Sequence, residues 1–355
     1  MNNDPKLAID YKCQCGDSPI ISVVIPVFNQ QSNIIKNINS VLCSMSLPFE
    51  LLVMDDASTD DTLHVLKENL LNTAVSCPLL TSIQFFAYQK SAYETKCDSF
   101  GFLTAQSNYI LEIQADMEIT EKGFDGRMLE ALRKFPDLIM VSGRGAEKIE
   151  DIYPGYIKAI GAGRFFIIYF LKYLFVRRIK HAYKAIFNSG DRRLTKDNYY
   201  EGCSDEVLFP EQEGFKKSGR AGRLGLHIES NIPILEKYKN KIWLSETVMR
   251  GPLLVDKKKY LEVGGFDSER FFLGYDDHDL AMRAWNLKGY RSGYVPVGFL
   301  SPLADGATRK MRTIKQEFEI LSNLVRTQNV SKESALYSAL KVLKDKNINI
   351  QIREF

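Results

Sequence analysis

Runs of β-branched and apolar residues alternate with helix-like segments through the first 142 residues of the chain. The strand-like runs cover 21–28, 49–56, 82–88, 109–116 and 137–142. The segments between them place apolar residues at helical spacing over 31–45, 58–70, 93–106 and 124–135. Strands joined by helices need crossover connections, so neighbouring strands run parallel. The pattern predicts an α/β fold with a mostly parallel central sheet.

Acidic residues close two of these predicted strands. Asp55 and Asp56 end the second run, and Asp116 ends the fourth. Sheets of this kind bind ligands beyond the carboxyl ends of their strands, so we expect the three acids to share one cleft. Asp55 or Asp56 can accept a hydrogen bond from a base N–H or a ribose hydroxyl, and both residues also suit turns and helix caps.

The segment QADME (114–118) carries a candidate metal site. A carboxylate at Asp116 suits Mg²⁺ or Mn²⁺, and such an ion would neutralise a diphosphate. Glu118 is a second candidate ligand, or a solvated side chain.

A third acidic segment is GYDDHDL (274–280). Three acids within four residues repel one another, which raises a carboxyl pKa and suits a general base. The acids also fit the first turn of a helix, where the helix dipole stabilises negative charge. Both interpretations can hold together.

Composition and motifs exclude several classes of protein. A net charge of +3 over 355 residues is too small to predict nucleic-acid binding. The N-terminus lacks the layout of a signal peptide, and the six cysteines are scattered. Dinucleotide-binding and P-loop glycine motifs are absent from the sequence. We therefore expect a cytoplasmic chain that is not secreted and binds no nucleic acid.

Changes in composition divide the chain into five parts. We expect an N-terminal extension, a first half of the α/β domain, a helical and basic insertion, a second half of the domain, and a helical C-terminal tail. Their ranges are 1–19, 20–145, 146–242, 243–310 and 311–355.

The insertion contains an aromatic and basic stretch at 163–187. It fits a core helix whose Lys and Arg side chains reach the surface. It also fits an interfacial helix that gives the chain peripheral contact with a membrane, but the nearly continuous apolar residues at 165–171 favour burial.

Taken together, these segments resemble the inverting family 2 glycosyltransferases of the GT-A fold, a Rossmann-like fold of the nucleotide-diphospho-sugar transferase superfamily. The matching segments are ISVVIPVFNQQSNIIKNINSVL, FELLVMDDASTDDT, YILEIQADMEI and RGPLLVDKKKYLEVGGFDSERFFLGYDDHDLAMRAW. They cover about 20–142 and 246–299 in the family's order.

The resemblance implies roles for individual residues. Asp116 matches the last acid of the family's DxD motif, the metal ligand, with Gln114 and Ala115 before it. Asp277 matches the catalytic base, and Asp276 stands where Glu is usual. The remaining assignments place the nucleotide at Pro26, Val27, Asn29 and Asp55 or Asp56, and the acceptor at Arg250, Gly265, Phe266 and Asp267.

Two departures from the family pattern weaken the expectation of a metal. Gln114 replaces the first acid of DxD, and the stretch 297–303 lacks the family's histidine. Arg309 and Lys310 could instead clamp the diphosphate as fixed positive charge, or form a solvated turn. Arg220 and Arg223 are similar candidates on a glycine-flanked loop that can act as a lid.

The resemblance implies a hexosyltransferase-type enzyme that uses Mn²⁺ or Mg²⁺. It would move sugar from a UDP-linked donor to a glycan or lipid-linked acceptor with inversion, in glycan or polysaccharide synthesis. One alternative is a non-catalytic binding module of the same fold, which Gln114 encourages. Another is a sugar-nucleotidyltransferase, but PVFNQQSN (26–33) lacks the glycine-rich basic loop of such enzymes.

Overall fold

The computed structural model describes residues 4–12, 18–74, 76–147, 223–224, 239–245, 247–269, 271–272, 274, 276–300 and 351–355. The stretch 163–187 lies outside the described residues, as do Arg220, Arg309 and Lys310. The chain divides into two compact units, residues 1–146 with 225–355 and residues 147–224. In the second unit the structure describes the backbone of Glu147, Arg223 and Leu224.

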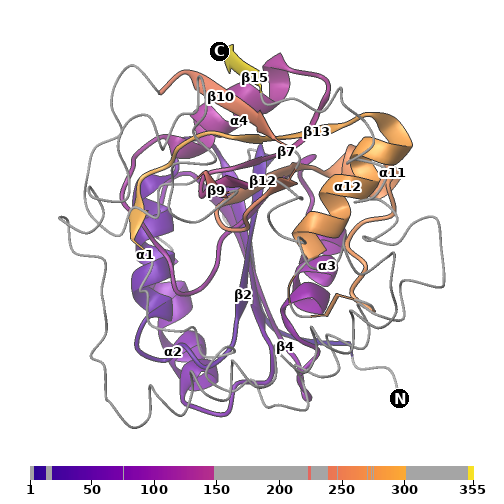
Figure 1. The fold of residues 1–355 in the computed structure, drawn as a ribbon. Coiled ribbons are helices and arrows are strands. Elements are labelled where there is room, and N and C mark those ends of the chain that lie inside the picture. The colour runs from indigo at the N-terminus through magenta and orange to yellow at the C-terminus, as the bar shows by residue number, and fades with distance from the viewer. Residues whose placement is uncertain are drawn as a thin grey trace, which may run out of the picture. The chain divides into compact units, whose positions relative to one another are not determined.

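A ten-stranded sheet forms the centre of the first unit (Figure 1). Its strands, in spatial order, are β1 (Lys6–Lys12), β4 (Leu80–Ala87), β3 (Phe49–Asp55), β2 (Ile21–Val27), β5 (Tyr109–Glu112), β12 (Leu253–Asp256), β7 (Leu138–Ser142), β13 (Arg291–Tyr294), β10 (Lys241–Ser245) and β15 (Gln351–Glu354). The pairs β4–β3, β3–β2, β2–β5 and β7–β13 are parallel. The predicted α/β fold is therefore confirmed, and its sheet is mixed but largely parallel.

Strand β12 is the main departure from the predicted parallel sheet. It lies between β5 and β7 and runs antiparallel to both. As a result β5 and β7 still point the same way, and so do their carboxyl ends. Short strands complete the set: β6 (Glu118–Ile119), β8 (Ala146–Glu147), β9 (Arg223–Leu224), β11 (Thr247–Val248) and β14 (Phe299–Leu300).

Helices cover both faces of this sheet. Their bounds are α1 (Ile34–Ser44), α2 (Thr62–Ala74), α3 (Glu94–Thr104), α4 (Phe124–Lys134), α11 (Lys257–Glu262) and α12 (Asp276–Lys288). Figure 1 shows α1 and α2 on one side of β2, with α3, α11 and α12 on the other. Among the described residues, none of these helices has the length and apolarity that crossing a membrane requires.

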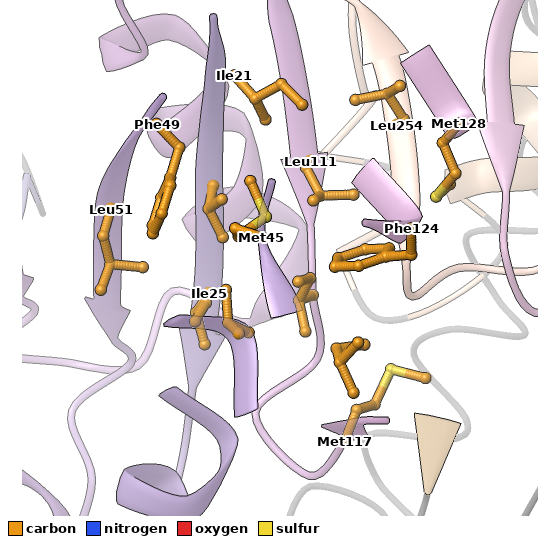
Figure 2. Packing of buried hydrophobic residues seen from close by; sticks show 14 of the residues in the cluster. Ile21, Ile25, Met45, Phe49, Leu51, Leu111, Met117, Phe124, Met128 and Leu254 are labelled. Atoms are coloured by element: carbon orange, nitrogen blue, oxygen red, sulfur yellow. The ribbon is translucent and has the colours of Figure 1, made fainter. Parts of the chain in front are cut away.

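The two faces of β2 belong to different core layers. Ile21, Val23 and Ile25 pack in the layer that contains the buried residues of α1, α2 and α4. Val24 packs in the layer of α3, α11 and α12. Because both faces are covered, the strand reads as a continuous apolar run rather than an alternating one. Figure 2 shows members of the first layer, among them Ile25, Leu111 and Phe124.

Strand β5 is shorter than predicted, because it ends at Glu112 and not at Asp116. The buried amide of Asn37 on α1 donates to the carbonyl oxygens of Gln114 at 2.9 Å and Met117 at 2.6 Å. These bonds hold residues 114–117 in a turn rather than in the sheet. Asp116 therefore lies four residues beyond the strand, on a turn held in place by α1.

Two leucine truncations test the core assignment. Leu111 on β5 is 0% exposed, whereas Leu103 on α3 is 63% exposed. We expect Leu111→Ala to lower the free energy of unfolding by about 2–5 kcal/mol, because it leaves a cavity. The matched change Leu103→Ala should stay within about 0.5 kcal/mol of the wild type. Urea unfolding measures both, and equal losses would contradict the core assignment.

Candidate active site

The carboxyl ends of β2, β3, β5 and β7 meet at one edge of the sheet, because these strands run in the same direction. Asp55 is the last residue of β3, and the segments that follow β2, β5 and β7 carry Asn29, Gln114 and Arg144. This edge is where ligands bind in sheets of this class. The candidate site is therefore built from these loops and from the elements that pack against them.

The loops after β2 and β3 are hydrogen-bonded into one unit. Asn29 has a positive φ of 52°, and its backbone N–H donates to Ser58 Oγ at 3.0 Å. The Asn29 side chain accepts from the Thr59 N–H at 2.7 Å. The Asp56 N–H donates to the Val27 carbonyl at 2.9 Å. The structure thus brings together Val27, Asn29 and Asp55–Asp56, which were predicted to line one side of the ligand.

Asp55 and Asp56 differ in what their carboxylates bind. Asp56 accepts from the backbone N–H groups of Ala92 and Tyr93 at 2.5 and 3.1 Å and from the Ser91 hydroxyl at 2.7 Å. Asp55 accepts from the Ser58 N–H at 3.2 Å, while its Oδ1 is buried without a hydrogen bond. Burial raises the pKa of both carboxyls. Asp56 is thus engaged by the loop before α3, whereas Asp55 has an oxygen to spare.

The predicted metal-binding segment forms the turn after β5. Gln114 is engaged at both ends of its amide: Oε1 accepts from Arg144 at 2.9 Å and Nε2 donates to Glu94 at 3.4 Å. Gly251 packs against this turn with φ +63°, and a Cβ there would come within 2.9 Å of Gln114 Cγ. Asp116 is half-buried and Glu118 is exposed on β6. The turn therefore presents two carboxylates beside a neutral amide that is already hydrogen-bonded.

A buried guanidinium lies at the centre of four carboxylates from three elements. Arg250 is 7% exposed. Its Nη1 is 2.9 Å from Asp276 Oδ2 on α12 and 3.8 Å from Glu94 Oε1 on α3. Its Nη2 donates to Asp98, also on α3, and its Nε lies 3.9 Å from Glu112 Oε2 on β5. We call these five residues the Arg250 cluster.

The Arg250 cluster has more acid than one guanidinium can neutralise. Burial raises the pKa of Asp98 to about 7 and the pKa of Asp276 to about 8. The positive charge of Arg250 lowers both pKa values, but its effect is smaller than that of burial. Burial also raises the pKa of Glu112 well above its usual value. Both oxygens of Glu112 are buried without a hydrogen bond. A charged group transferred from water to such a site is unfavourable unless paired, so the surplus acids retain protons.

Sequence reasoning missed Glu94, Asp98, Glu112 and Arg144. A weak signal existed for Glu112, a charged residue within the apolar run YILEI. Glu94 and Asp98 have the i, i+4 spacing that puts two acids on one helical face. Neither signal identifies Arg250 as their partner, because that pairing depends on the long-range arrangement of β5 and β12.

Helix α12 carries the predicted base at its first turn. Asp276 is directed to Arg250, while Asp277 is 8% exposed and accepts from the His278 N–H at 2.8 Å. One turn later, Arg283 pairs with Asp279 at 2.7 Å. Its guanidinium also donates to the carbonyl oxygens of Val263 and Gly265, both at 2.5 Å.

The predicted acceptor-side turn, GGFD, is held by these contacts. The Phe266 N–H donates to the Tyr260 hydroxyl at 2.9 Å, and the Phe266 ring centroid lies 5.3 Å from the Arg250 guanidinium carbon. Gly265 has φ +66°, and a Cβ there would come within 3.0 Å of the Tyr260 ring. Asp267 is half-buried. The turn is therefore next to the Arg250 cluster through Phe266.

Among the described residues, Glu94, Asp98 and Glu112 form a group whose ligand oxygens lie within 4.8 Å of one another, as a metal site requires. The Arg250 guanidinium lies within 4 Å of all three carboxylates. The guanidinium therefore supplies these three carboxylates with the positive charge that a metal ion would otherwise bring. Asp116 and Glu118 are not part of it.

Comparison with known proteins finds similarity over part of the chain. Residues 22–73 match the sequence model of a family described as Glycosyl transferase family 2, which confirms the resemblance seen in the sequence. A stretch of 54 residues is 37% identical to Chondroitin synthase of Escherichia coli. That match covers 15% of this chain and 8% of the relative.

Solved structures of glycosyltransferases are also similar to this chain. S. aureus TarS 1-349 in complex with UDP-GlcNAc has a TM-score of 0.46 and 12% identity, over 88% of this chain and 67% of that one. Mannosyltransferase PcManGT from Pyrobaculum calidifontis, in complex with GDP-Man and Mn²⁺, has a TM-score of 0.47 and 14% identity, over 93% of this chain and 75% of that one. This chain covers 40% of a longer TarS structure.

The raised pKa values predict how stability depends on pH. Asp98 and Asp276 titrate near 7 and 8 when folded and near 3.8 when unfolded, so the folded state holds more protons between these values. Their contribution to stability is complete below the unfolded pKa and is lost as pH rises through the folded pKa. Thermal unfolding at pH 6 and pH 9 should show Tm lower at pH 9 by at least about 2 °C.

The isosteric change Asp98→Asn provides the control for this measurement. It removes one titrating carboxyl and leaves an oxygen that can accept from Arg250. The fall in Tm between pH 6 and pH 9 should therefore be smaller in Asp98→Asn. An identical fall in the variant and the wild type would show that the Arg250 cluster is not its source.

Proposed function

We propose that this chain, whose residues 22–73 match the sequence model of Glycosyl transferase family 2, transfers a sugar from a nucleotide-diphosphate donor to an acceptor hydroxyl with inversion. The observation that carries this proposal is a continuous series of contacts between two predicted motifs. Gln114 of the QAD turn contacts Glu94, Glu94 contacts Arg250, and Arg250 contacts Asp276, the neighbour of Asp277. A donor-binding turn and a candidate base are thereby linked through one buried cluster.

The nucleotide end of the donor is proposed to bind beside β2 and β3. Pro26, Val27 and Asn29 provide one wall, and the unpaired oxygen of Asp55 provides an acceptor for a base N–H or ribose hydroxyl. Asp56 instead supports the wall, because its carboxylate is occupied by residues 91–93. The resemblance favours UDP as the nucleotide.

The turn after β5 is proposed to receive the diphosphate. Its donor set suits a hard cation, because Asp116 and Glu118 supply carboxylate oxygens, while Gln114 is already hydrogen-bonded. A bound Mn²⁺ or Mg²⁺ would neutralise charge on the leaving diphosphate. Arg144, which contacts Gln114, adds fixed positive charge at the same turn. Asp116 would hold the ion, with Glu118 as the further oxygen ligand.

The proposed catalytic base is Asp277 rather than Asp276. Asp276 is completely buried and paired with Arg250, so it cannot reach an acceptor. Asp277 would take the proton of the acceptor hydroxyl as that oxygen attacks the anomeric carbon opposite the leaving diphosphate. One such displacement inverts the configuration at that carbon. The turn at Gly265, Phe266 and Asp267 would lie on the acceptor side.

The acceptor is proposed to be a glycan or a lipid-linked glycan, and the transferred group a hexosyl unit. The 37% identity over 54 residues with Chondroitin synthase of Escherichia coli supports a role in polysaccharide synthesis.

A non-catalytic binding module is the second candidate. The observation in its favour is Gln114, a neutral amide hydrogen-bonded to Arg144 where the family carries an acid. Such a module would bind nucleotide sugars without turning them over. Assays of donor turnover therefore distinguish the two proposals.

Replacing the proposed base tests catalysis directly. Asp277→Asn keeps the side-chain shape but cannot accept the acceptor's proton, so nucleotide release in the presence of acceptor sugars should fall about 10²- to 10⁴-fold. Donor binding, followed as the thermal shift of the folded chain with and without Mn²⁺, should persist. The matched control is Asp10→Asn on exposed β1. Full turnover by Asp277→Asn would exclude this residue as the base.

Asp55 and Asp56, at the end of β3, should respond differently to replacement by Asn. Asp56→Asn places an NH₂ group against backbone donors, so urea unfolding should show a loss of about 1–3 kcal/mol. Asp55→Asn should remain close to wild type in stability and weaken UDP binding about tenfold in calorimetric titration. Unchanged UDP binding by Asp55→Asn would remove Asp55 from the nucleotide site.

A further inference from the structure

We propose that Arg250 is a positioning residue, which holds the first turn of α12, and therefore Asp277, in fixed relation to the turn after β5. The inference rests on the proposed function, because it assigns Asp277 the role of base. Arg250 belongs to neither element: it precedes β12 in the chain. Its guanidinium nevertheless contacts Asp276 on α12 and Asp98 and Glu94 on α3.

The contact with Asp276 determines where Asp277 lies. Asp276 and Asp277 are consecutive residues of the first turn of α12. The Asp276 carboxylate is held at 2.9 Å by Arg250, and both side chains are buried. A movement of this hydrogen-bonded pair must move the backbone that carries Asp277. Arg250 itself is 7% exposed and its guanidinium is turned to acids, so it acts through Asp276 rather than on a substrate.

The contact with Glu94 extends the same arrangement to the donor side. Glu94 lies 3.8 Å from Arg250 Nη1 and accepts from the Gln114 amide at 3.4 Å. Gln114 is two residues before Asp116. The Arg250 backbone carbonyl faces Arg144 Nη1 at 3.5 Å, and Arg144 also donates to Gln114. The guanidinium and the carbonyl of Arg250 therefore both connect to the turn that would bind diphosphate.

The position of Arg250 requires a planar group with donors that point in several directions. Its nitrogens face carboxylates in different directions: Nη1 faces Asp276 and Glu94, Nη2 faces Asp98, and Nε faces Glu112. The ring of Phe266 lies 5.3 Å from the guanidinium carbon. A lysine ammonium is a compact point charge and cannot match a planar fork of donors. Arg250→Lys therefore keeps the charge but loses the simultaneous contacts.

The informative variants are those that keep a cation among the four acids. Arg250→Met leaves four acids without a cation and is expected to lose the fold, so it is not the informative change. Arg250→Lys retains the cation, and Asp276→Asn retains an oxygen that can accept from Arg250 while it replaces the carboxyl group. Neither change touches Asn29 or Asp55, which are proposed to bind the nucleotide.

The experiment compares kcat, KM and UDP affinity of the full chain and its variants. Arg250→Lys should lower kcat about 10- to 100-fold, the effect expected of a misplaced catalytic group. Asp276→Asn should lower kcat in the same direction. UDP affinity should change less than about threefold. A tenfold weakening would require the loss of a contact with the nucleotide, and neither variant removes one. Unchanged kcat in a folded Arg250→Lys would overturn the proposal.

Arg353→Lys is the matched control. Arg353 lies on the edge strand β15 and makes a two-bond pair with Asp137 at 2.8 and 3.0 Å. It is an arginine–aspartate pair outside the candidate site, so its loss reports the general cost of removing such a pair. Its kcat should equal that of wild type. An equal fall in kcat for Arg353→Lys and Arg250→Lys would identify the effect as one of stability alone.

Hydrogen exchange of the ligand-free chain separates this inference from the proposed function. Arg250→Lys should raise exchange of the amides of residues 276–280 and leave α4 as protected as in wild type. Unchanged exchange at 276–280 would overturn the positioning role whatever the activity. A wild-type chain that neither binds nor turns over a nucleotide sugar would overturn the proposed function, while the exchange result still decides whether Arg250 holds this turn.

Discussion

A guanidinium buried among carboxylates links the parts of the candidate site. Arg250 contacts acids that belong to α3 and β5, which are neighbours in the chain, and to α12, which lies far from both in the sequence. Burying these charges is costly, and their attraction compensates only when the geometry is good and the polar atoms are paired. Burial is the main cause of the raised pKa values of Asp98 and Asp276, and repulsion from the neighbouring acids adds to it. The cluster therefore depends on a fixed arrangement of three elements.

The sheet explains why the polar groups collect at one edge. Strands β2 and β3 are buried along their entire length, because helices cover both faces of the sheet. Side chains that bind a polar ligand must then lie beyond the strand ends, in the loops. Strand β12 preserves this arrangement by running antiparallel between β5 and β7. The ends of β2, β3, β5 and β7 thus remain on the same side.

The local sequence pattern predicted strands such as β2 and β3. Long-range packing determined where β5 ends and where β12 lies in the sheet. The expected strands at 21–28 and 49–56 correspond to β2 and β3 within one residue, because continuous apolar runs have few other structures available. The predicted strand to Asp116 was too long, because a side-chain amide from α1 holds residues 114–117 in a turn. The place of β12 within the sheet has no local signal, because sheet order depends on tertiary packing.

The alternation of strands and helices, the resemblance to family 2 glycosyltransferases and the three acidic segments at 55–56, 116 and 276–277 can be read from the sequence, because each is expressed by residues close together in the chain. The differences between the acids arise only in the folded chain. Asp56 is engaged by residues 91–93, whereas Asp55 retains an oxygen without a partner. Asp276 is paired with Arg250, whereas its neighbour Asp277 is not. The physical reason is that burial and pairing depend on partners distant in sequence, which only the folded chain brings into contact.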